Sequence, residues 1–172
     1  VSVPRNSTWE INIPAMLEAI DDQARIVFLA SPNNPTGNLL TESDARSLLE
    51  TGIVVCVDET YYEFAQISLS HLLEEYENLV ILRSFSKWAG IAGLRVGYAI
   101  ASETLIRHLM DIKQPYNINV AGEAAVLAAL KYRDELLKRA ASLIVQRKRL
   151  EEAIDGLDGI SYYPSEGNFL LC

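Results

Sequence analysis

The fold is indicated first by the stretch Leu79-Val80-Ile81-Leu82-Arg83-Ser84-Phe85-Ser86-Lys87-Trp88-Ala89-Gly90-Ile91-Ala92-Gly93-Leu94-Arg95. It begins with four consecutive apolar residues, the pattern of a strand that is buried on both faces. It continues as a loop that places one lysine among two hydroxyls, two glycines and one arginine. A strand that is followed by such a polar loop indicates a sheet whose strand ends carry a ligand site.

Similar apolar runs and helical segments alternate on both sides of this stretch. The apolar runs predict strands at residues 25–29, 53–57, 79–82 and 95–100. Helical spacing and cap residues predict helices at 14–20, from Thr41 to Gly52, at 70–76 and at 102–112. Buried strands that alternate with amphipathic helices predict an α/β fold, with a mostly parallel sheet and helices on both faces.

The pattern changes after residues 114–116. An alanine-rich helix is predicted at 121–130 and a long charged helix at 133–154, followed by two short strands around Tyr162 and Phe169. We therefore predict that residues 1–135 are part of a large domain. Residues 136–172 are predicted to form a connecting helix and the start of a small α/β domain. The unfinished strand at the end of the sequence leads us to expect a piece of a longer protein.

Composition limits the classes of partner. The chain has 172 residues, of which 49% are hydrophobic and 22% charged, as in ordinary globular domains. The net charge of −8 argues against nucleic acid and against anionic membranes as partners. Two cysteines are too few for a disulfide framework, and no apolar stretch approaches the length of a membrane helix. We expect a cytoplasmic protein with small-molecule ligands.

Four polar residues fall at or near predicted strand ends, where α/β sheets bind ligands: Asn34, Asp58, Lys87 and Arg95. Lys87 becomes a useful nucleophile where its charge is disfavoured, and it can then form a Schiff base with an aldehyde. The alternative is a surface lysine in a glycine loop. The coincidence of four such positions favours the chemical interpretation.

An anion site is predicted beside this lysine. Ser84 and Ser86 offer hydroxyls, and the Arg95 guanidinium can bind two phosphate oxygens at once. The loop lacks the glycine and lysine spacing of a Walker A motif. Alternatively, the two serines cap a turn and Arg95 forms a surface ion pair.

A carboxylate and two hydrogen-bond donors complete the candidate site. Asp58 ends an apolar run, where its charge is costly unless it meets a cation such as a protonated ring nitrogen. Tyr61 and Asn34 can donate hydrogen bonds to a ring oxygen. The alternatives are a capping or metal-binding Asp58 and an ordinary turn at Asn34. His71 and His108 show no metal-ligand spacing.

Three segments in order, at 31–37 (Ser-Pro-Asn-Asn-Pro-Thr-Gly), 57–61 (Val-Asp-Glu-Thr-Tyr) and 84–98, resemble the motifs of fold-type I pyridoxal-phosphate aminotransferases of class I/II. Residues 114–120 resemble the corresponding segment of histidinol-phosphate aminotransferases. The resemblance covers nearly the whole chain. It implies pyridoxal 5'-phosphate as the cofactor and transamination between an amino acid or amino phosphate ester and a 2-oxo acid.

The resemblance also implies a role for each candidate residue. Lys87 matches the Schiff-base lysine, Asp58 the partner of the ring nitrogen, Asn34 and Tyr61 the donors to the ring oxygen, and Ser84, Ser86 and Arg95 the phosphate ligands. It implies a homodimer in amino-acid biosynthesis, with other parts of the site outside these residues. We therefore expect the 172 residues alone to have little activity. The open alternatives are a threonine-phosphate-type decarboxylase and a non-catalytic sensing domain of a transcription regulator.

Overall fold

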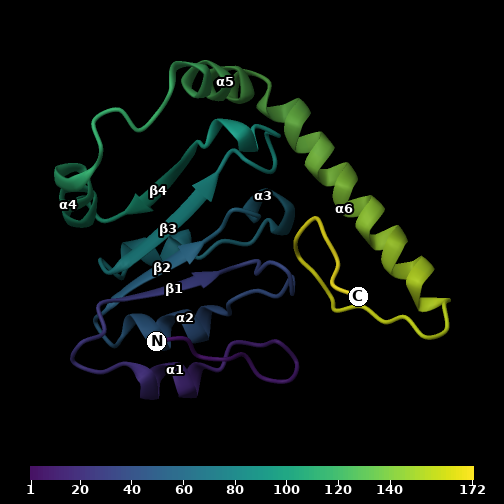
Figure 1. Cartoon of the computed structure of the whole chain (residues 1–172), viewed down its shortest axis with the longest axis horizontal. Coiled ribbons are helices and arrows are strands. Elements are labelled where there is room, and N and C mark those ends of the chain that lie inside the picture. The colour runs from purple at the N-terminus through teal and green to yellow at the C-terminus, as the bar shows by residue number, and fades with distance from the viewer.

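A four-stranded sheet forms the centre of the computed structural model, which describes all 172 residues (Figure 1). The strands are β1 (Ile26–Ala30), β2 (Val54–Asp58), β3 (Leu79–Ser84) and β4 (Gly97–Ala101), and they lie in this order across the sheet. The first three strands are parallel to one another, whereas β4 is antiparallel to β3. The predicted mostly parallel α/β sheet is confirmed.

The helices are α1 (Ile13–Ala19), α2 (Glu42–Leu49), α3 (Tyr62–Ala65), α4 (Glu103–Ile112), α5 (Val120–Lys131) and α6 (Arg133–Asp155), with short 3₁₀ helices η1 (Ser70–Glu74) and η2 (Ala92–Leu94). Four of the helices, α1, α2, α4 and α5, begin at residues whose side chains cap them. The side chains of Asn12, Thr41 and Ser102 accept hydrogen bonds from backbone N–H groups in the first turns of α1, α2 and α4. The short helix α3 has no side-chain cap and was not predicted.

The main core lies on one face of the sheet. Alternate residues of β2 and β3 pack against apolar side chains of α1, α2 and η1; this cluster includes Val55, Val57, Leu79, Ile81, Leu48 and Leu72. On the opposite face, the Ile26 and Phe28 side chains of β1 remain 51% and 71% exposed. The helical cover that the sequence predicts for both faces therefore does not extend over β1.

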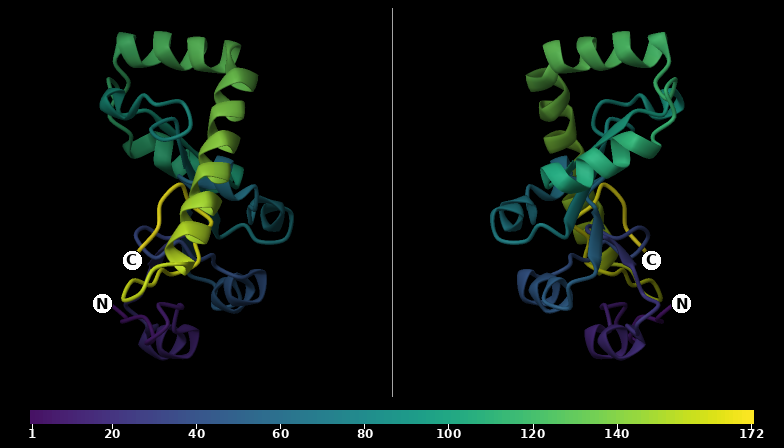
Figure 2. Two further views of the ribbon diagram at one scale, coloured as in Figure 1. Left: turned by 90° about the vertical axis from the view of Figure 1, so that its right-hand side faces the viewer. Right: turned by 90° about the vertical axis from the view of Figure 1, so that its left-hand side faces the viewer.

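The last third of the chain crosses the sheet and returns to it. Helices α5 and α6 meet at a sharp angle, and α6 runs past the strand ends (Figures 1 and 2). The C-terminal segment then folds back between α6 and the sheet (Figure 1). The two short strands predicted around Tyr162 and Phe169 do not form. A single bridge between Tyr163 and Leu171 takes their place.

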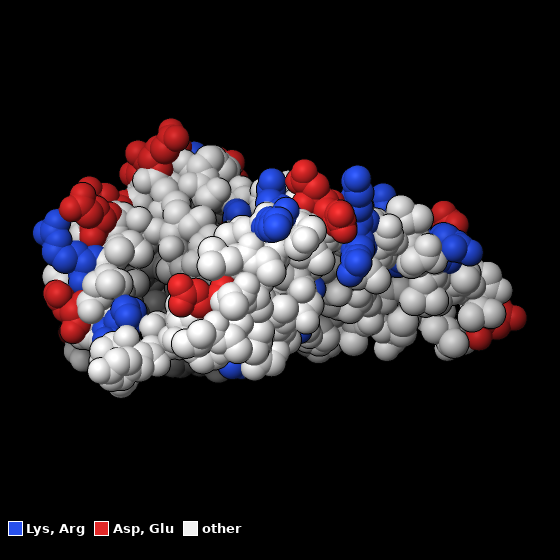
Figure 3. Space-filling view, turned by 90° about the horizontal axis from the view of Figure 1, so that it is seen from above, with Lys and Arg blue, Asp and Glu red and all other residues white.

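Charged side chains of both signs are interspersed on the face seen from above (Figure 3). No continuous basic stripe crosses this face. None of the helices combines the length and the apolar character that a membrane span requires.

Candidate functional site

The candidate residues come from the ends of strands and from the loops beside them, at one end of the sheet. Strands β1, β2 and β3 finish at this end, and Asp58 lies in register with Ala30 of β1 and Leu82 of β3. Strand β4 starts there, because Gly97 lies opposite Ser84. The structure therefore confirms the expectation that neighbouring strand ends carry the polar residues.

Asp58 ends the central strand β2. By alternation its side chain shares a face of the sheet with Cys56, whose thiol has its pKa raised to about 11 by burial and by the nearby Asp58 carboxylate. One oxygen of Asp58, Oδ1, accepts a hydrogen bond from the backbone N–H of Thr60 at 2.9 Å. The other oxygen, Oδ2, makes no hydrogen bond within the chain and can accept one from a ligand.

Asn34, Tyr61 and Lys87 come together from three different loops. The Asn34 side-chain amide donates a hydrogen bond to the Tyr61 hydroxyl at 2.8 Å. The Lys87 Nζ lies 5.6 Å from the centroid of the Tyr61 ring, within reach of a cation–π contact. Tyr61 is buried, whereas Asn34 and Lys87 are exposed. The ring of Tyr61 is therefore the fixed centre, beside which an amine and an amide face solvent.

Ser84 and Ser86 form a small hydroxyl pair at the end of β3. Their Oγ atoms are 2.8 Å apart, and the Ser86 backbone N–H donates to Ser84 Oγ at 3.0 Å. The Arg95 backbone lies nearby, since the carbonyl of Val96 accepts a hydrogen bond from Phe85 N–H. The Arg95 guanidinium contacts neither serine, however. It donates to the carbonyl of Ala92 at 3.0 Å and is exposed.

Arg95 is the residue that ends the 3₁₀ helix η2. Its backbone is left-handed, with a φ of 57°, as is common for a residue that ends a helix. Its guanidinium forms none of the chain's ion pairs. The surface ion pair considered from the sequence is therefore wrong, and the guanidinium remains available to an anion.

A buried ion pair between Glu59 and Arg83, which the sequence did not predict, lies beside the site. The Glu59 carboxylate, next to Asp58, accepts hydrogen bonds from Arg83 of β3 at 2.9 and 3.2 Å and from Ser68 at 2.8 Å. The Arg83 guanidinium also lies over the Tyr62 ring, 3.5 Å from its centroid. These contacts attach the start of α3, and with it Tyr61, to the sheet.

The C-terminal segment also reaches the site. The backbone N–H of Glu166 donates to the carbonyl of Gly37 at 2.8 Å, in the loop that carries Asn34. The ring of Phe169 packs edge-on against Tyr61, with centroids 5.0 Å apart. No sequence motif indicated these contacts, which join residues more than 100 positions apart.

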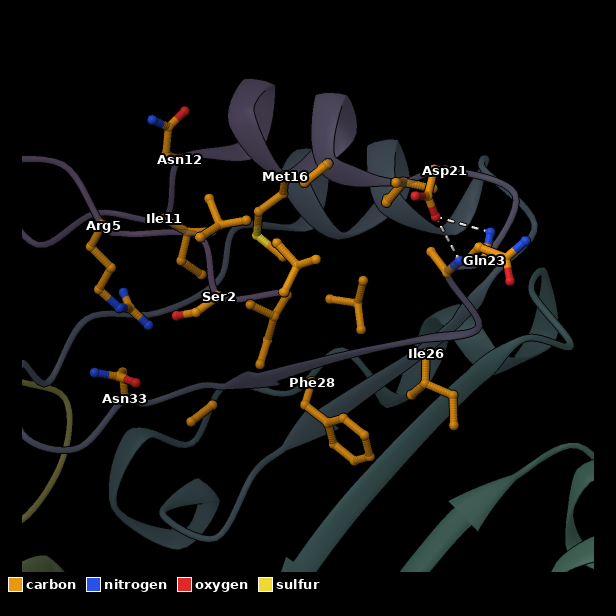
Figure 4. A pocket seen from close by; sticks show the side chains of 18 residues that line it. Ser2, Arg5, Ile11, Asn12, Met16, Asp21, Gln23, Ile26, Phe28 and Asn33 are labelled. Carbon is orange, nitrogen blue, oxygen red and sulfur yellow. Dashed lines mark hydrogen bonds between the residues drawn. The ribbon is translucent and has the colours of Figure 1, made fainter.

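A cavity of about 600 Å³ lies elsewhere, between the N-terminal segment, α1 and the open edge of β1 (Figure 4). Met16 and Ile11 point into it, whereas Phe28 points away from α1 (Figure 4). Its lining is mostly apolar and contains no lysine. It therefore lacks the groups that the predicted chemistry needs.

The donor set fits pyridoxal phosphate. An amine at Lys87 suits an aldehyde, and the hydroxyls of Ser84 and Ser86 with the Arg95 guanidinium, which forms no ion pair, suit a phosphate. The bonded pair of Asn34 and Tyr61 suits a ring oxygen, and a free oxygen of Asp58 suits a ring N–H. Three or more His, Cys, Asp or Glu side chains nowhere gather in the arrangement that a metal ion needs.

Comparison with known proteins gives a consistent result. The family model described as aminotransferase class I and II matches residues 1–172. A histidinol-phosphate aminotransferase of Roseiflexus castenholzii is 47% identical over the whole chain, which covers 47% of that protein. The chain thus spans about half the length of the curated relatives it matches.

Solved structures share the fold. The histidinol-phosphate aminotransferase of Sinorhizobium meliloti in complex with pyridoxal-5'-phosphate superposes with a TM-score of 0.85 at 28% identity, over 99% of this chain and 48% of that one. A decarboxylase from Sulfurospirillum multivorans has a TM-score of 0.80 at 28% identity, over 98% of this chain and 52% of that one.

Proposed function

Because this chain belongs to the class I and II aminotransferase family, we propose that it forms the lysine-bearing part of a pyridoxal-phosphate-dependent aminotransferase. The observation that carries the proposal is the convergence of Asn34, Tyr61 and Lys87 at the end of the sheet where β1, β2 and β3 finish. The proposed enzyme moves an amino group between an amino donor and a 2-oxo acid.

Each residue has a distinct role in this proposal. When bound, pyridoxal phosphate supplies an aldehyde carbon and a ring that accepts electrons. Lys87 Nζ is the amine that binds the aldehyde and later carries a proton between two carbon positions. Asp58 accepts a hydrogen bond from the ring nitrogen and keeps it protonated, since a nearby carboxylate favours the cation.

The remaining groups orient the cofactor. Asn34 and Tyr61 donate to the ring oxygen, and their own hydrogen bond fixes their spacing at 2.8 Å. Ser84, Ser86 and Arg95 bind the phosphate, and the Arg95 guanidinium uses only Nη1 for its bond to the Ala92 carbonyl. Its remaining N–H groups can bind two phosphate oxygens at once, and the opposite charges strengthen these hydrogen bonds.

Absorption spectroscopy of the complete polypeptide tests the proposal. Reconstitution with pyridoxal phosphate should give the visible band of a lysine-bound aldehyde. Lys87→Ala should abolish the band, whereas Lys113→Ala, an exposed lysine outside the site, should keep it. An unchanged band in Lys87→Ala would refute the assignment.

The name of the curated relative suggests the amino donor. We propose an amino phosphate ester of the histidinol-phosphate type, as the 47% identity to a histidinol-phosphate aminotransferase favours. Incubation of the reconstituted protein with histidinol phosphate and a 2-oxo acid should yield the corresponding amino acid. Transfer from other donors but not from histidinol phosphate would leave the reaction class standing and reject this substrate.

A decarboxylase is the second candidate, because a structure described as a decarboxylase shares the fold at 28% identity. The same cofactor geometry can direct cleavage of a carboxylate instead of amino transfer. Release of carbon dioxide from an amino-acid substrate, without amino transfer to a 2-oxo acid, would favour it.

A homodimer is the proposed assembly. The surface of residues 112–130 exposes several large apolar side chains: Ile112, Tyr116, Val120, Leu127 and Leu130. Exposed apolar patches of this kind often mark protein interfaces. Sedimentation of the complete polypeptide should give the mass of two chains, and Leu127→Glu should reduce this mass.

The cytoplasmic location of the protein stays a prediction.

A further inference from the structure

We propose that Phe169 is a positioning residue for Tyr61 and that it thereby sets the direction in which Asn34 and Tyr61 offer hydrogen bonds to the cofactor. This inference rests on the proposed function where it concerns the cofactor. Its first part, the control of Tyr61 by Phe169, concerns only contacts within the chain.

The first observation is the packing of the Tyr61 ring. Phe169 meets it edge-on, at 5.0 Å between centroids and 77° between planes, while Phe64 meets it at 6.3 Å and 48°. Edge-to-face contact is a favoured arrangement for aromatic pairs. A tyrosine side chain has two rotatable torsions, so the groups that pack on its ring determine where its hydroxyl lies. Phe64 belongs to α3, the helix that starts directly after Tyr61, whereas Phe169 comes from the far end of the chain.

The second observation is that Phe169 sits in a fitted place. At Gly167, an added Cβ would lie 2.5 to 2.7 Å from two carbons of the Phe169 ring. Only a glycine leaves room for the ring there. The Phe169 ring therefore packs directly against the Gly167 backbone, and a side chain at position 167 would displace it.

The third observation is that the turn before Phe169 is bonded on two sides. Glu166 N–H donates to the Gly37 carbonyl at 2.8 Å, in the loop that carries Asn34. The buried Arg147 donates from Nη1 to the Gly167 carbonyl at 2.6 Å, which attaches the turn to α6. Phe169 is thus held between the Asn34 loop and α6.

The test uses the complete polypeptide with four variants: Phe169→Ala, Phe169→Leu, Tyr61→Phe and the double variant of Phe169→Ala with Tyr61→Phe. Ile160→Ala, an exposed position in the same C-terminal segment, is the control. In cofactor-free protein, the measurement is the solvent exchange rate of the Asn34 side-chain amide protons by NMR. Phe169→Ala should raise this rate about threefold to tenfold, toward the rate in Tyr61→Phe, because the Asn34–Tyr61 hydrogen bond weakens.

With cofactor bound, the measurement is the pH midpoint of the visible band. Hydrogen bonds from Asn34 and Tyr61 stabilise the negative charge on the ring oxygen. Loosening these bonds should therefore raise the pH midpoint of the band, by about half a pH unit in Phe169→Ala and less in Phe169→Leu. The double variant should match Tyr61→Phe alone, because Phe169 acts through Tyr61.

The outcomes separate the two proposals. Absence of a band in the unmutated protein would refute the proposed function, while the exchange rate would still decide whether Phe169 positions Tyr61. A normal band whose midpoint does not change in Phe169→Ala, with an unchanged exchange rate, would overturn the positioning role. A lower melting temperature with both readouts unchanged would likewise overturn it, since Phe169 would then only add stability.

Discussion

Arg83 and Glu59 form an ion pair that is almost completely removed from water, with side chains that are 11% and 1% exposed and a shortest N–O distance of 2.9 Å. Removing one partner of such a pair leaves a buried charge without compensation. We expect Glu59→Gln to lower the free energy of unfolding by about 3 kcal/mol, measured by urea denaturation.

The matched control for Glu59→Gln is Glu42→Gln. Glu42 bonds Arg46 on the surface of α2 at the i,i+4 spacing, where water screens the charges. We expect little change in its unfolding curve. Equal destabilisation by the two substitutions would show that the burial of Glu59 is not what makes its ion pair important.

Glu63 of α3 should make stability depend on pH. Burial, the main cause, raises the pKa of this carboxyl to about 7, and one of its oxygens is buried without a hydrogen-bond partner. Arg83 and Arg133 act in the opposite direction, and Glu59 adds to the increase. The folded chain therefore holds this proton more tightly than the unfolded chain, where the pKa is the ordinary 4.5.

Because the folded chain holds this proton more tightly, its stability falls as the pH rises. The stabilising contribution of protonated Glu63 is fully present below pH 4.5 and is lost as pH rises through about 7. Because the group is only partly buried, we expect a loss of about 1 kcal/mol between pH 5 and pH 8. Glu63→Gln should remove this part of the pH dependence, whereas Glu74→Gln, an exposed carboxyl, should retain it. The same pH slope in Glu63→Gln and the unmutated chain would contradict the assignment.

Local signals in the sequence were enough to predict the strands and most helices. Apolar runs identify β2 and β3 because their residues are buried mainly by neighbours that any parallel sheet supplies, and the same pattern identifies β1 although two of its side chains remain exposed. Thr41 and Ser102 mark helix starts because a cap bonds to the backbone three residues later. Helix α3 was missed because it is four residues long and has no cap.

Contacts between distant residues were not predictable in this way. Glu59 looks like a surface residue after a strand, and its burial depends on Arg83, 24 positions later. The candidate site was predicted as a set of strand ends, which brought Asn34, Tyr61 and Lys87 together but not the Arg95 guanidinium. The strands predicted around Tyr162 and Phe169 do not form, because backbone groups between them bond elsewhere. The Glu166 N–H donates to the Gly37 carbonyl, and the Gly167 carbonyl accepts from Arg147.

Arg147 should be important for the C-terminal turn. Its guanidinium is buried in α6, donates to the Gly167 carbonyl and lies 3.1 Å from the Glu151 carboxylate. We expect Arg147→Met, which keeps most of the apolar stem, to lower the free energy of unfolding by about 2–3 kcal/mol. Backbone hydrogen exchange at Glu166 should become faster.

Arg149, two residues along the same helix, provides the control. It is exposed and bonds only the Gln146 side chain. Arg149→Met should change stability by less than about 0.5 kcal/mol and leave exchange at Glu166 unaltered. If Arg147→Met behaved like Arg149→Met, the bond to Gly167 would not hold the turn.

Gly37 should tolerate no side chain, for two separable reasons. Its φ of 77° is left-handed, and an added Cβ would collide with both the side chain and the backbone of Ser165. Gly52 has a similar φ of 81° but open space around it, so Gly52→Ala measures the backbone strain alone. We expect Gly52→Ala to lower the free energy of unfolding by about 1 kcal/mol and Gly37→Ala by about 1–3 kcal/mol more.

Gly37→Ala should also displace the turn that holds Phe169, so cofactor affinity should fall in this variant and not in Gly52→Ala. Equal effects of the two substitutions on stability and on cofactor affinity would mean that the contact between Gly37 and Ser165 does not matter to the site.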